Sequence, residues 1–333
     1  MKAMVLPEFK SAEGKPLELR EVEPPVPGPS EIVVKVNYCG VCHTDLHTVE
    51  GELPLISLPR IPGHQVAGTV EKAGEKASLF RVGDRAGVAW LWSACGQCAF
   101  CRSSRENLCL EAKFTGYHVD GGYAEHVVVP EAFAYELPED FFDEQAAPLL
   151  CAGIIGYRAL RLSRIKPGEK LGLFGFGASA HVTIQVARHW GCRVYVFSRS
   201  EEHRKHALEF GAYWVGAPDE NPPDKLDSAI VFAPAGEVAR QALSRIDRGG
   251  TVALAGIYMT AIPQLDYGKE LYFEKALKSV ANATRQDGVE FLKIAAEIPL
   301  KTDIQVYPLE KANEALLDVK HSRINGAAVL KIG

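Results

Sequence analysis

The sequence predicts an α/β protein in which a mostly β first part is followed by a doubly wound parallel sheet. With 333 residues the chain is about twice as long as a typical single domain. The first 150 residues are rich in Pro and Gly and carry short β-like runs between turn residues: Ile32 to Val36, Gln65 to Val70 and His126 to Val129. From about Cys151 onward, short apolar strands alternate with helical stretches, the pattern of βαβ units on a parallel sheet.

The second part carries the clearest element signals. The expected strands are Leu171 to Phe174, Arg193 to Phe197, Ser228 to Phe232 and Thr251 to Ala255, and the expected helices are Ser179 to Trp190 and Glu202 to Phe210. After residue 285 the character is mixed again, and the chain ends in an apolar run, Ala327 to Ile332, able to rejoin the first part. We therefore divide the chain into 1–150, 151–285 and a returning segment, 286–333.

Composition excludes several classes of partner. Lys and Arg number 37 against 42 Asp and Glu, a net charge of −5, which argues against nucleic acid and anionic membranes as the main partner. No apolar run approaches the roughly 20 residues needed to span a bilayer, and the N-terminus lacks the apolar core of a signal peptide. We expect a cytoplasmic protein whose eight cysteines are reduced.

Four cysteines lie within 15 residues, in the pattern Cys-x2-Cys-x2-Cys-x7-Cys: Cys95, Cys98, Cys101 and Cys109. Four thiolates make a closed tetrahedral zinc site, which is structural because no position is left for a substrate. The alternatives are an iron–sulfur cluster, although the spacing differs from the ferredoxin run with its Cys-Pro end, and buried cysteines that bind no metal.

A second set of metal-binding residue types is spread more widely. Cys42 and His64 sit in short motifs that contain glycine, and Cys151 stands where the βαβ half begins. Two cysteines and one histidine leave the fourth zinc position open, as a catalytic site requires. Each residue alone has a simpler interpretation, as a buried thiol or a hydrogen-bonded structural histidine.

A dinucleotide-binding turn is predicted where the first strand of the second part ends. Gly175-x-Gly177 and then Ala178, Ser179 and Ala180 follow the strand and open a helix. The first glycine permits the tight turn, the second lets the backbone approach a pyrophosphate at the helix N-terminus, and the fingerprint permits alanine at the third position. The flanking strand and helix supply the context that the motif requires.

The end of the next strand indicates which dinucleotide is bound. An NAD site would place an acid there for the ribose 2′-hydroxyl, but this chain has Ser198 and Arg199. A hydroxyl and a guanidinium suit a 2′-phosphate, so we expect NADP(H) in preference to NAD(H). Glu201 and Glu202 follow closely and could weaken such a site, and the alternative is that Arg199 is only a solvated loop residue.

Together these motifs resemble the zinc-containing medium-chain dehydrogenase/reductase family, and within it the alcohol dehydrogenases. The family's zinc signature, GHE-x2-G-x5-G-x2-V, appears here as Gly63-His64-Gln65, Gly68, Gly74 and then Ala77. The similarity covers nearly the whole chain. It implies a GroES-like β-domain, a Rossmann domain, a C-terminal segment that returns to the first domain, and a homo-oligomer, dimer or tetramer.

The resemblance also implies roles for single residues. Cys42, His64 and Cys151 match the ligands of the catalytic zinc, so that the chain would bind two zinc ions. Asp45 matches the carboxylate that orients the zinc histidine. Thr44 matches the hydroxyl that takes the alcohol proton, and His47 the histidine that ends the relay through the nicotinamide ribose. His43 matches a basic position near the pyrophosphate of the cofactor.

Two features bear on the chemistry. Gln65 replaces the family's usual Glu, which puts in doubt any step that needs a carboxylate beside the zinc and favours a bound alkoxide. Trp90 and Trp92 lie in a region that lines the substrate pocket of relatives, and would favour a modest-sized apolar primary alcohol or aldehyde; ordinary core packing is the equal alternative.

The expected activity is reversible hydride transfer between an alcohol or aldehyde and NAD(P)(H). A polyol dehydrogenase is one rival, although such relatives usually have a Glu where this chain has Cys151. A non-enzymatic zinc protein that senses redox state through its nucleotide site is another.

Overall fold

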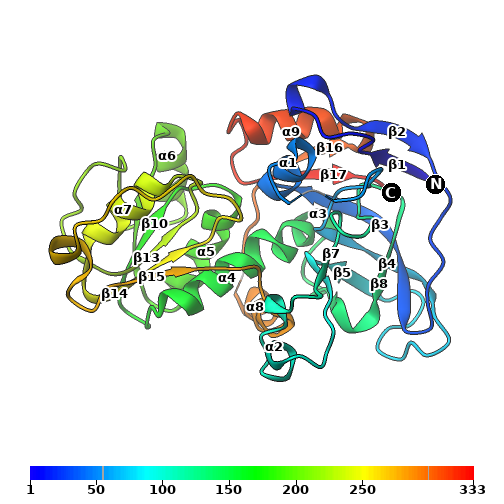
Figure 1. Cartoon of the computed structure of the whole chain (residues 1–333), viewed down its shortest axis with the longest axis horizontal. Coiled ribbons are helices and arrows are strands. Elements are labelled where there is room, and N and C mark those ends of the chain that lie inside the picture. The colour runs from blue at the N-terminus through cyan, green and yellow to red at the C-terminus, as the bar shows by residue number, and fades with distance from the viewer. Residues whose placement is uncertain (55, 299) are drawn as a thin grey trace. The chain divides into compact units, whose positions relative to one another are not determined.

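The chain folds into two compact units, described here from a computed structural model that covers residues 1–54, 56–298 and 300–333 (Figure 1). The first unit comprises Met1–Cys151, Thr284–Ala296 and Lys301–Gly333. The second comprises Ala152–Ala283 and Glu297–Leu300. Within the described residues, no helix is long and apolar enough to cross a membrane.

The first unit is built on a mostly antiparallel sheet. Among the described residues its strand order is β16-β17-β3-β4-β5-β9, with β8 also paired to β3. The bounds are β3 Glu31–Val41, β4 Val66–Ala73, β5 Arg85–Val88, β8 His126–Pro130, β9 Ala134–Glu136, β16 Ile304–Pro308 and β17 Ala327–Lys331. Two small ribbons accompany it, formed by β1 Lys2–Val5 with β2 Glu18–Glu21, and by β6 Leu91–Ser93 with β7 Lys113–Phe114.

Strand β3 organises this unit because three other strands pair with it. Ile32, Val34 and Val36 alternate along it and are fully buried in the hydrophobic core. The C-terminal strand β17 pairs antiparallel with its second half, from Ala328 opposite Val41 to Lys331 opposite Tyr38. A strand from the C-terminal segment therefore pairs with the central strand of this sheet.

Short helices surround this sheet. They are α1 His43–Glu50, α2 Ala99–Arg102, α3 Asp143–Ala146, α8 Arg285–Glu297 and α9 Ala312–Lys320, together with the 3-10 turns η1 Ala12–Gly14, η2 Glu106–Leu108, η3 Glu131–Phe133, η4 Ala147–Leu150 and η6 Leu309–Lys311. Helix α1 follows β3 after a single residue, Cys42, so the central strand of the sheet fixes where that helix begins.

The second unit is a parallel sheet in the order β12-β11-β10-β13-β14-β15 (Figure 1). The strands are β10 Lys170–Phe174, β11 Arg193–Phe197, β12 Trp214–Gly216, β13 Leu226–Val231, β14 Ile246–Leu254 and β15 Ala276–Ser279; the helices are α4 Ala152–Ser163, α5 Ala178–His189, α6 Glu201–Glu209 and α7 Gly236–Arg245. Counted from β10, this is the 3-2-1-4-5-6 order of a Rossmann fold. The predicted fold class is confirmed.

The sequence analysis did not predict the two edge strands, β12 and β15. Trp214–Gly216 is short and half-buried, and Ala276–Ser279 has no fully buried residue. A strand exposed on one side needs no continuous apolar run, so these segments look like loops in sequence. The predicted strand Thr251 to Ala255 corresponds to the buried second half of β14, whose first half, beginning at Ile246, is mostly exposed.

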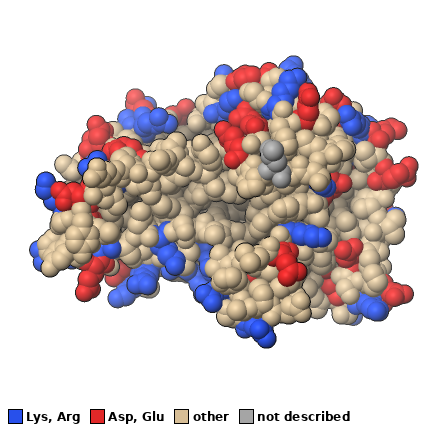
Figure 2. Space-filling view, viewed as in Figure 1, with Lys and Arg blue, Asp and Glu red and all other residues tan. Residues whose placement is uncertain are grey.

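Charged side chains of both signs are interspersed on the face of the molecule drawn in Figure 2. This mixture agrees with the small net charge of −5. A face of this kind does not generate the extended positive field by which nucleic-acid-binding proteins attract phosphate.

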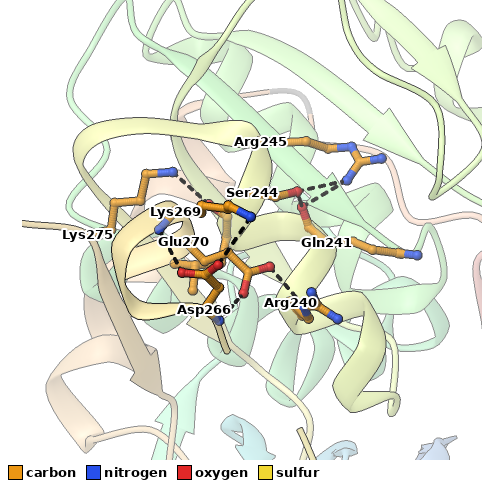
Figure 3. A network of polar contacts seen from close by, with 9 residues as sticks. Arg240, Gln241, Ser244, Arg245, Asp266, Lys269, Glu270 and Lys275 are labelled. Carbon is orange, nitrogen blue, oxygen red and sulfur yellow. Dashed lines mark hydrogen bonds and ion pairs between the residues drawn. The ribbon is translucent and has the colours of Figure 1, made fainter. Parts of the chain in front are cut away.

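A polar network fixes the segment between β14 and β15 (Figure 3). The π-helix η5, Tyr267–Leu271, is capped by Asp266, whose Oδ1 accepts a hydrogen bond from the amide of Lys269 at 3.2 Å. Glu270 is buried and accepts from the amide of Asp266 at 2.7 Å and from Nε of Arg240, on α7, at 2.8 Å. One carboxylate therefore ties an irregular turn to the helix that covers the sheet.

We expect Glu270→Ala to lower the free energy of unfolding by about 1–3 kcal/mol, because it leaves the Asp266 amide and the Arg240 guanidinium without this acceptor. Thermal melting monitored by circular dichroism measures the effect. Glu314→Ala is the matched control, since the ion pair of Glu314 with Lys311 lies at the surface and such pairs contribute little. Equal melting temperatures for the two variants would refute the stabilising role of the network.

Candidate active site

The site begins where strand β3 ends and helix α1 starts. Cys42 is the N-cap residue in extended conformation, and its Sγ accepts a hydrogen bond from the amide of Thr44 at 3.3 Å. Asp45 forms the reciprocal hydrogen bond, in which its Oδ2 accepts from the amide of Cys42 at 3.0 Å. This is a capping box with sulfur in place of the usual hydroxyl. The amides of the first helical turn also favour the thiolate form of Cys42.

Asp45 also orients His64. Both side chains are buried, and Asp45 Oδ1 lies 3.0 Å from Nδ1 of His64. A carboxylate accepts a hydrogen bond there only from a protonated Nδ1, so the other ring nitrogen is the one available as a ligand. That atom, Nε2, lies 3.5 Å from the Cys42 sulfur.

Cys151 completes a group of three potential ligands. It follows η4, and its sulfur, the Cys42 sulfur and a ring nitrogen of His64 all lie within 4.8 Å of one another. Zn–S bonds of about 2.3 Å and Zn–N bonds of about 2.0–2.1 Å at the tetrahedral angle would place sulfur and nitrogen about 3.6 Å apart. The 3.5 Å separation between Cys42 and His64 agrees with a shared metal ion. With three protein ligands, one tetrahedral position is left for another molecule.

The electrostatics of this group favour a cation. The hydrogen bond with Cys151 and the nearby imidazole lower the pKa of the Cys42 thiol well below its ordinary value. Burial alone would disfavour a charged His64, but the carboxylate of Asp45 and the sulfur of Cys42 outweigh it and raise the pKa of His64 to about 10. The same hydrogen bond with Cys42, together with burial, raises the pKa of the Cys151 thiol, so the negative charge of the group lies on the Cys42 sulfur.

The four-cysteine group converges on one point. The Cys101 sulfur lies 3.9 Å from that of Cys95 and 3.6 Å from that of Cys98, and all four sulfurs, including Cys109, lie within 4.8 Å. Four sulfurs on one zinc would be about 3.8 Å apart, whereas a disulfide requires about 2.05 Å. The ligands of a multi-iron cluster bind different irons and stand farther apart. The donor set fits a single tetrahedral ion.

Backbone amides stabilise these thiolates. The amide of Cys98 donates to the Cys95 sulfur at 3.4 Å, and that of Cys101 donates to the Cys98 sulfur at 3.5 Å. The amides of Gln97 and Cys98 lower the pKa of Cys95 to about 7. The close spacing of the cysteines thus supplies the four ligands and also places backbone N–H donors against the Cys95 and Cys98 sulfurs.

Aromatic side chains border His64. The ring of Trp90 lies edge-on to His64 at 5.0 Å and stacks on Phe114 at 5.2 Å, with Tyr117 at 5.6 Å. Trp92 behaves differently. Its indole N–H donates to the carbonyl of Val128 at 2.9 Å, and its ring packs on the hydrophobic core. Its contacts are those of core packing, the alternative considered for both tryptophans, whereas Trp90 lies against His64.

Gln65 directly follows His64, a member of the group formed with Cys42 and Cys151. It is buried, and a Cβ at Gly40 would lie 2.8 Å from its Cδ and Oε1, so the side chain covers the glycine just before the Cys42 turn. Among the described residues its Nε2 has no hydrogen-bond partner. The side-chain amide of Gln65 therefore has an N–H donor without an acceptor in the described part of the chain, at the position where the family's usual Glu would carry a negative charge.

Helix α1 carries three further predicted residues. His43 is exposed, Thr44 is half-buried and His47 is buried, with the two imidazole rings 6.2 Å apart. Nδ1 of His47 lies 2.5 Å from the Glu52 carboxylate just beyond the helix. These side chains therefore share the helix that Cys42 begins.

The predicted nucleotide turn has the expected shape. Gly175 has φ of +95°, which favours glycine, and its amide donates to the carbonyl of Phe197 on β11 at 2.8 Å. Gly177 caps α5, and a Cβ at that position would meet no atom within 4 Å, so the space in front of it is open. Ala180 is fully buried where the helix packs on the sheet. The turn leaves room for a group at the N-terminus of α5, which begins at Ala178.

The end of β11 presents positive charge. Ser198 is buried and its Oγ accepts from the amide of Ser200 at 3.3 Å, whereas Arg199 is exposed. Arg204, one helical turn on, donates to the carbonyl of Ser198 at 2.7 Å. Glu201 forms an ion pair with Lys205 at 3.0 Å, which reduces the repulsion that an anion would meet here.

Comparison with known proteins assigns the family. Residues 28–139 match the alcohol dehydrogenase GroES-like domain, and residues 180–297 match the zinc-binding dehydrogenase domain. The chain is 47% identical over 322 residues to the probable alcohol dehydrogenase AdhA of Mycobacterium tuberculosis, covering 95% of this chain and 93% of that protein. This chain belongs to the zinc-containing medium-chain alcohol dehydrogenases.

Other members of this family share the whole length. An alcohol dehydrogenase of Geobacillus stearothermophilus is 37% identical over 100% of both chains. Among solved structures, a cinnamyl alcohol dehydrogenase of Sorghum bicolor superposes with a TM-score of 0.91 at 26% identity, covering 99% of this chain and 97% of the other. The cobalt- and zinc-bound thermostable alcohol dehydrogenase of Pyrobaculum aerophilum gives 0.91 at 27% identity over 99% of each chain.

Some residues that lie around the candidate site had no signal in the sequence motifs. Phe114 and Tyr117 reach the Trp90 ring from a segment beyond the four-cysteine loop, and no spacing rule connects them to His64. Glu52 could have been found, because Gly51 is a helix-ending residue and the position after it folds back on the last turn.

We expect Asp45→Asn to weaken metal binding at the Cys42, His64 and Cys151 group by about 10–100-fold, because the carboxylate that fixes the His64 ring is lost. Transfer of metal from the purified protein to a chromogenic chelator measures the effect. The four-cysteine group, which Asp45 does not contact, serves as the internal control. Release of both metals at the parent rate would contradict the role of Asp45.

Proposed function

We propose that this protein is a zinc-dependent alcohol dehydrogenase that transfers hydride reversibly between a small alcohol or aldehyde and NADP(H). The observation that carries the proposal is the convergence of Cys42, His64 and Cys151 with one ligand position left over. Two zinc ions per chain correspond to the two ligand groups, with a structural role for the closed four-cysteine group.

The chain's own residues have distinct tasks in this reaction. A zinc ion at the open site would act as a Lewis acid on the substrate oxygen. Asp45 holds His64 in the tautomer that can bind the ion. Thr44 accepts the alcohol proton and His47 passes it towards solvent, as in the family relay. His43 would contact the pyrophosphate of the cofactor. Trp90, with its aromatic neighbours, favours an apolar substrate of modest size.

The preference for NADP(H) rests on the end of β11. Arg199 is exposed there, Ser198 supplies a hydroxyl, and the position lacks the acid that would bind a 2′-hydroxyl. The pairing of Glu201 with Lys205 supports the same choice, since it neutralises the acid nearest to Arg199 in sequence. Gly175, Gly177 and Ala178 would cradle the pyrophosphate at the N-terminus of α5.

We also propose the setting in which the enzyme works. Zinc-binding thiols require a reducing compartment, and all eight cysteines are free, so the cytoplasm is the expected location. The edge strand β15 supports assembly into a dimer or tetramer, because it leaves one side of the parallel sheet open to pairing.

An aldehyde panel assayed with NADPH and with NADH tests the activity. We expect oxidation of the reduced cofactor with apolar aldehydes, and loss of turnover in Cys42→Ser, whereas Cys192→Ser, a buried cysteine of the second unit, retains it. Faster oxidation of polyols than of simple alcohols would favour the polyol dehydrogenase. Absence of turnover with every substrate and both cofactors would favour the redox sensor.

Cofactor choice is tested separately by Arg199→Ala. We expect KM for NADPH to rise about 10–100-fold and KM for NADH to change little, because a charge-assisted contact to the 2′-phosphate is lost. Arg193→Ala, at the opposite end of the same strand, is the matched control. A higher kcat/KM with NADH than with NADPH in the parent enzyme would overturn the preference.

A further inference from the structure

The C-terminal end of helix α1 folds a carboxylate back onto His47. Gly51 ends the helix in the left-handed region, with φ of +71° and ψ of +25°. Its amide donates to the carbonyl of Thr48 at 3.3 Å, and the amide of Glu52 donates to the carbonyl of His47 at 3.0 Å. These are the two bonds of a Schellman motif. The motif fixes residue 52 beside residue 47 whatever the side chain at position 52 is.

The side chains of His47 and Glu52 are therefore in direct contact. Oε2 of Glu52 lies 2.5 Å from Nδ1 of His47. The His47 side chain is 9% exposed and that of Glu52 is 40% exposed, so the contact joins a buried imidazole to a carboxylate that reaches water. A carboxylate accepting the Nδ1 proton leaves the lone pair of the neutral ring on Nε2.

Helix stability does not account for an acid at this position. The C-terminus of a helix carries partial negative charge, so a carboxylate there is unfavourable. The nearest acid on the helix, Glu50, is compensated differently: Lys320 binds its carboxylate at 2.8 Å, and the amide of Ala12 donates to it at 2.8 Å. Glu52 instead directs its carboxylate at a histidine.

We propose that Glu52 is a positioning residue for proton transfer and forms a His–Glu pair with His47. The inference rests on the proposed relay through Thr44 and His47. Glu52 keeps Nε2 of His47 unprotonated and directed away from the carboxylate, so that it can accept the proton lost by the alcohol. The carboxylate then balances the charge of the imidazolium. One proton leaves to water, restoring the neutral ring and the free carboxylate, and no electron pair moves to or from the protein.

Three substitutions in the zinc-loaded enzyme separate orientation from charge. Glu52→Gln keeps an acceptor for the Nδ1 proton but removes the charge, Glu52→Ala removes both, and Glu52→Asp keeps the charge on a shorter side chain. We expect kcat for alcohol oxidation to fall about 10–100-fold in Glu52→Ala, a part of the 10²–10⁴-fold that a general base contributes. We expect Glu52→Gln to be intermediate, Glu52→Asp to recover part of the rate, and KM for the alcohol to change less than about twofold.

Chemical rescue provides a readout that a purely structural role would not move. Added imidazole should restore part of kcat in Glu52→Ala, because a small base can take the proton from the relay, whereas sodium chloride at equal ionic strength should not. Glu50→Gln is the matched control on the same helix end and should retain the parent kcat. The zinc content of all variants should equal that of the parent.

The outcomes separate this inference from the proposed function. An active parent, a slow His47→Gln and a normal Glu52→Ala would overturn the role of Glu52 and leave the dehydrogenase intact. A normal His47→Gln would overturn the relay and the role of Glu52 together. A loss in Glu52→Ala that imidazole does not rescue, accompanied by a raised KM, would assign Glu52 a structural role. An inactive parent would overturn the proposed function and this inference with it.

Discussion

Both oxygens of the Asp45 carboxylate accept hydrogen bonds, and the arrangement of Cys42, His64 and Cys151 depends on these two bonds. One oxygen accepts from the amide of Cys42 and so fixes the start of helix α1. The other accepts from Nδ1 of His64 and so fixes the imidazole of a different segment. The start of the helix sets the position of Cys42, and the orientation of the ring sets the position of the His64 nitrogen. A single buried acid therefore fixes these two potential ligands relative to each other.

Helix α1 connects Cys42, at its start, to the partly exposed Glu52 just beyond its end. Its first residue follows the Cys42 cap, its middle carries His47, and its last turn closes in a Schellman motif that brings Glu52 back to the same imidazole. The helix has only eight residues, so its two ends lie within about 12 Å at 1.5 Å per residue. Capping interactions at both ends, which usually serve helix stability alone, here also position the side chains of Cys42 and Glu52.

Local patterns explain why much of the site was predictable. The four-cysteine loop is closed within 15 residues, so spacing alone implies convergence, and the Gly175 turn lies between a strand and a helix that are themselves clear in sequence. Trp92 shows the limit of such reasoning. It is the same residue type as Trp90 and lies only two residues away, yet its indole N–H donates to the carbonyl of Val128 on β8. Only the tertiary contact between β6 and β8 distinguishes the two tryptophans.

The sequence by itself determined the fold class, the closed four-cysteine loop and the glycine turn before α5, because each is encoded by neighbours along the chain. Tertiary structure decided what depends on distant segments. It brought Cys151 to Cys42 and His64, placed Phe114 and Tyr117 against Trp90, and returned the C-terminal strand to β3. Such contacts join residues tens to hundreds of positions apart, and no local propensity specifies which of many apolar or thiol side chains will meet.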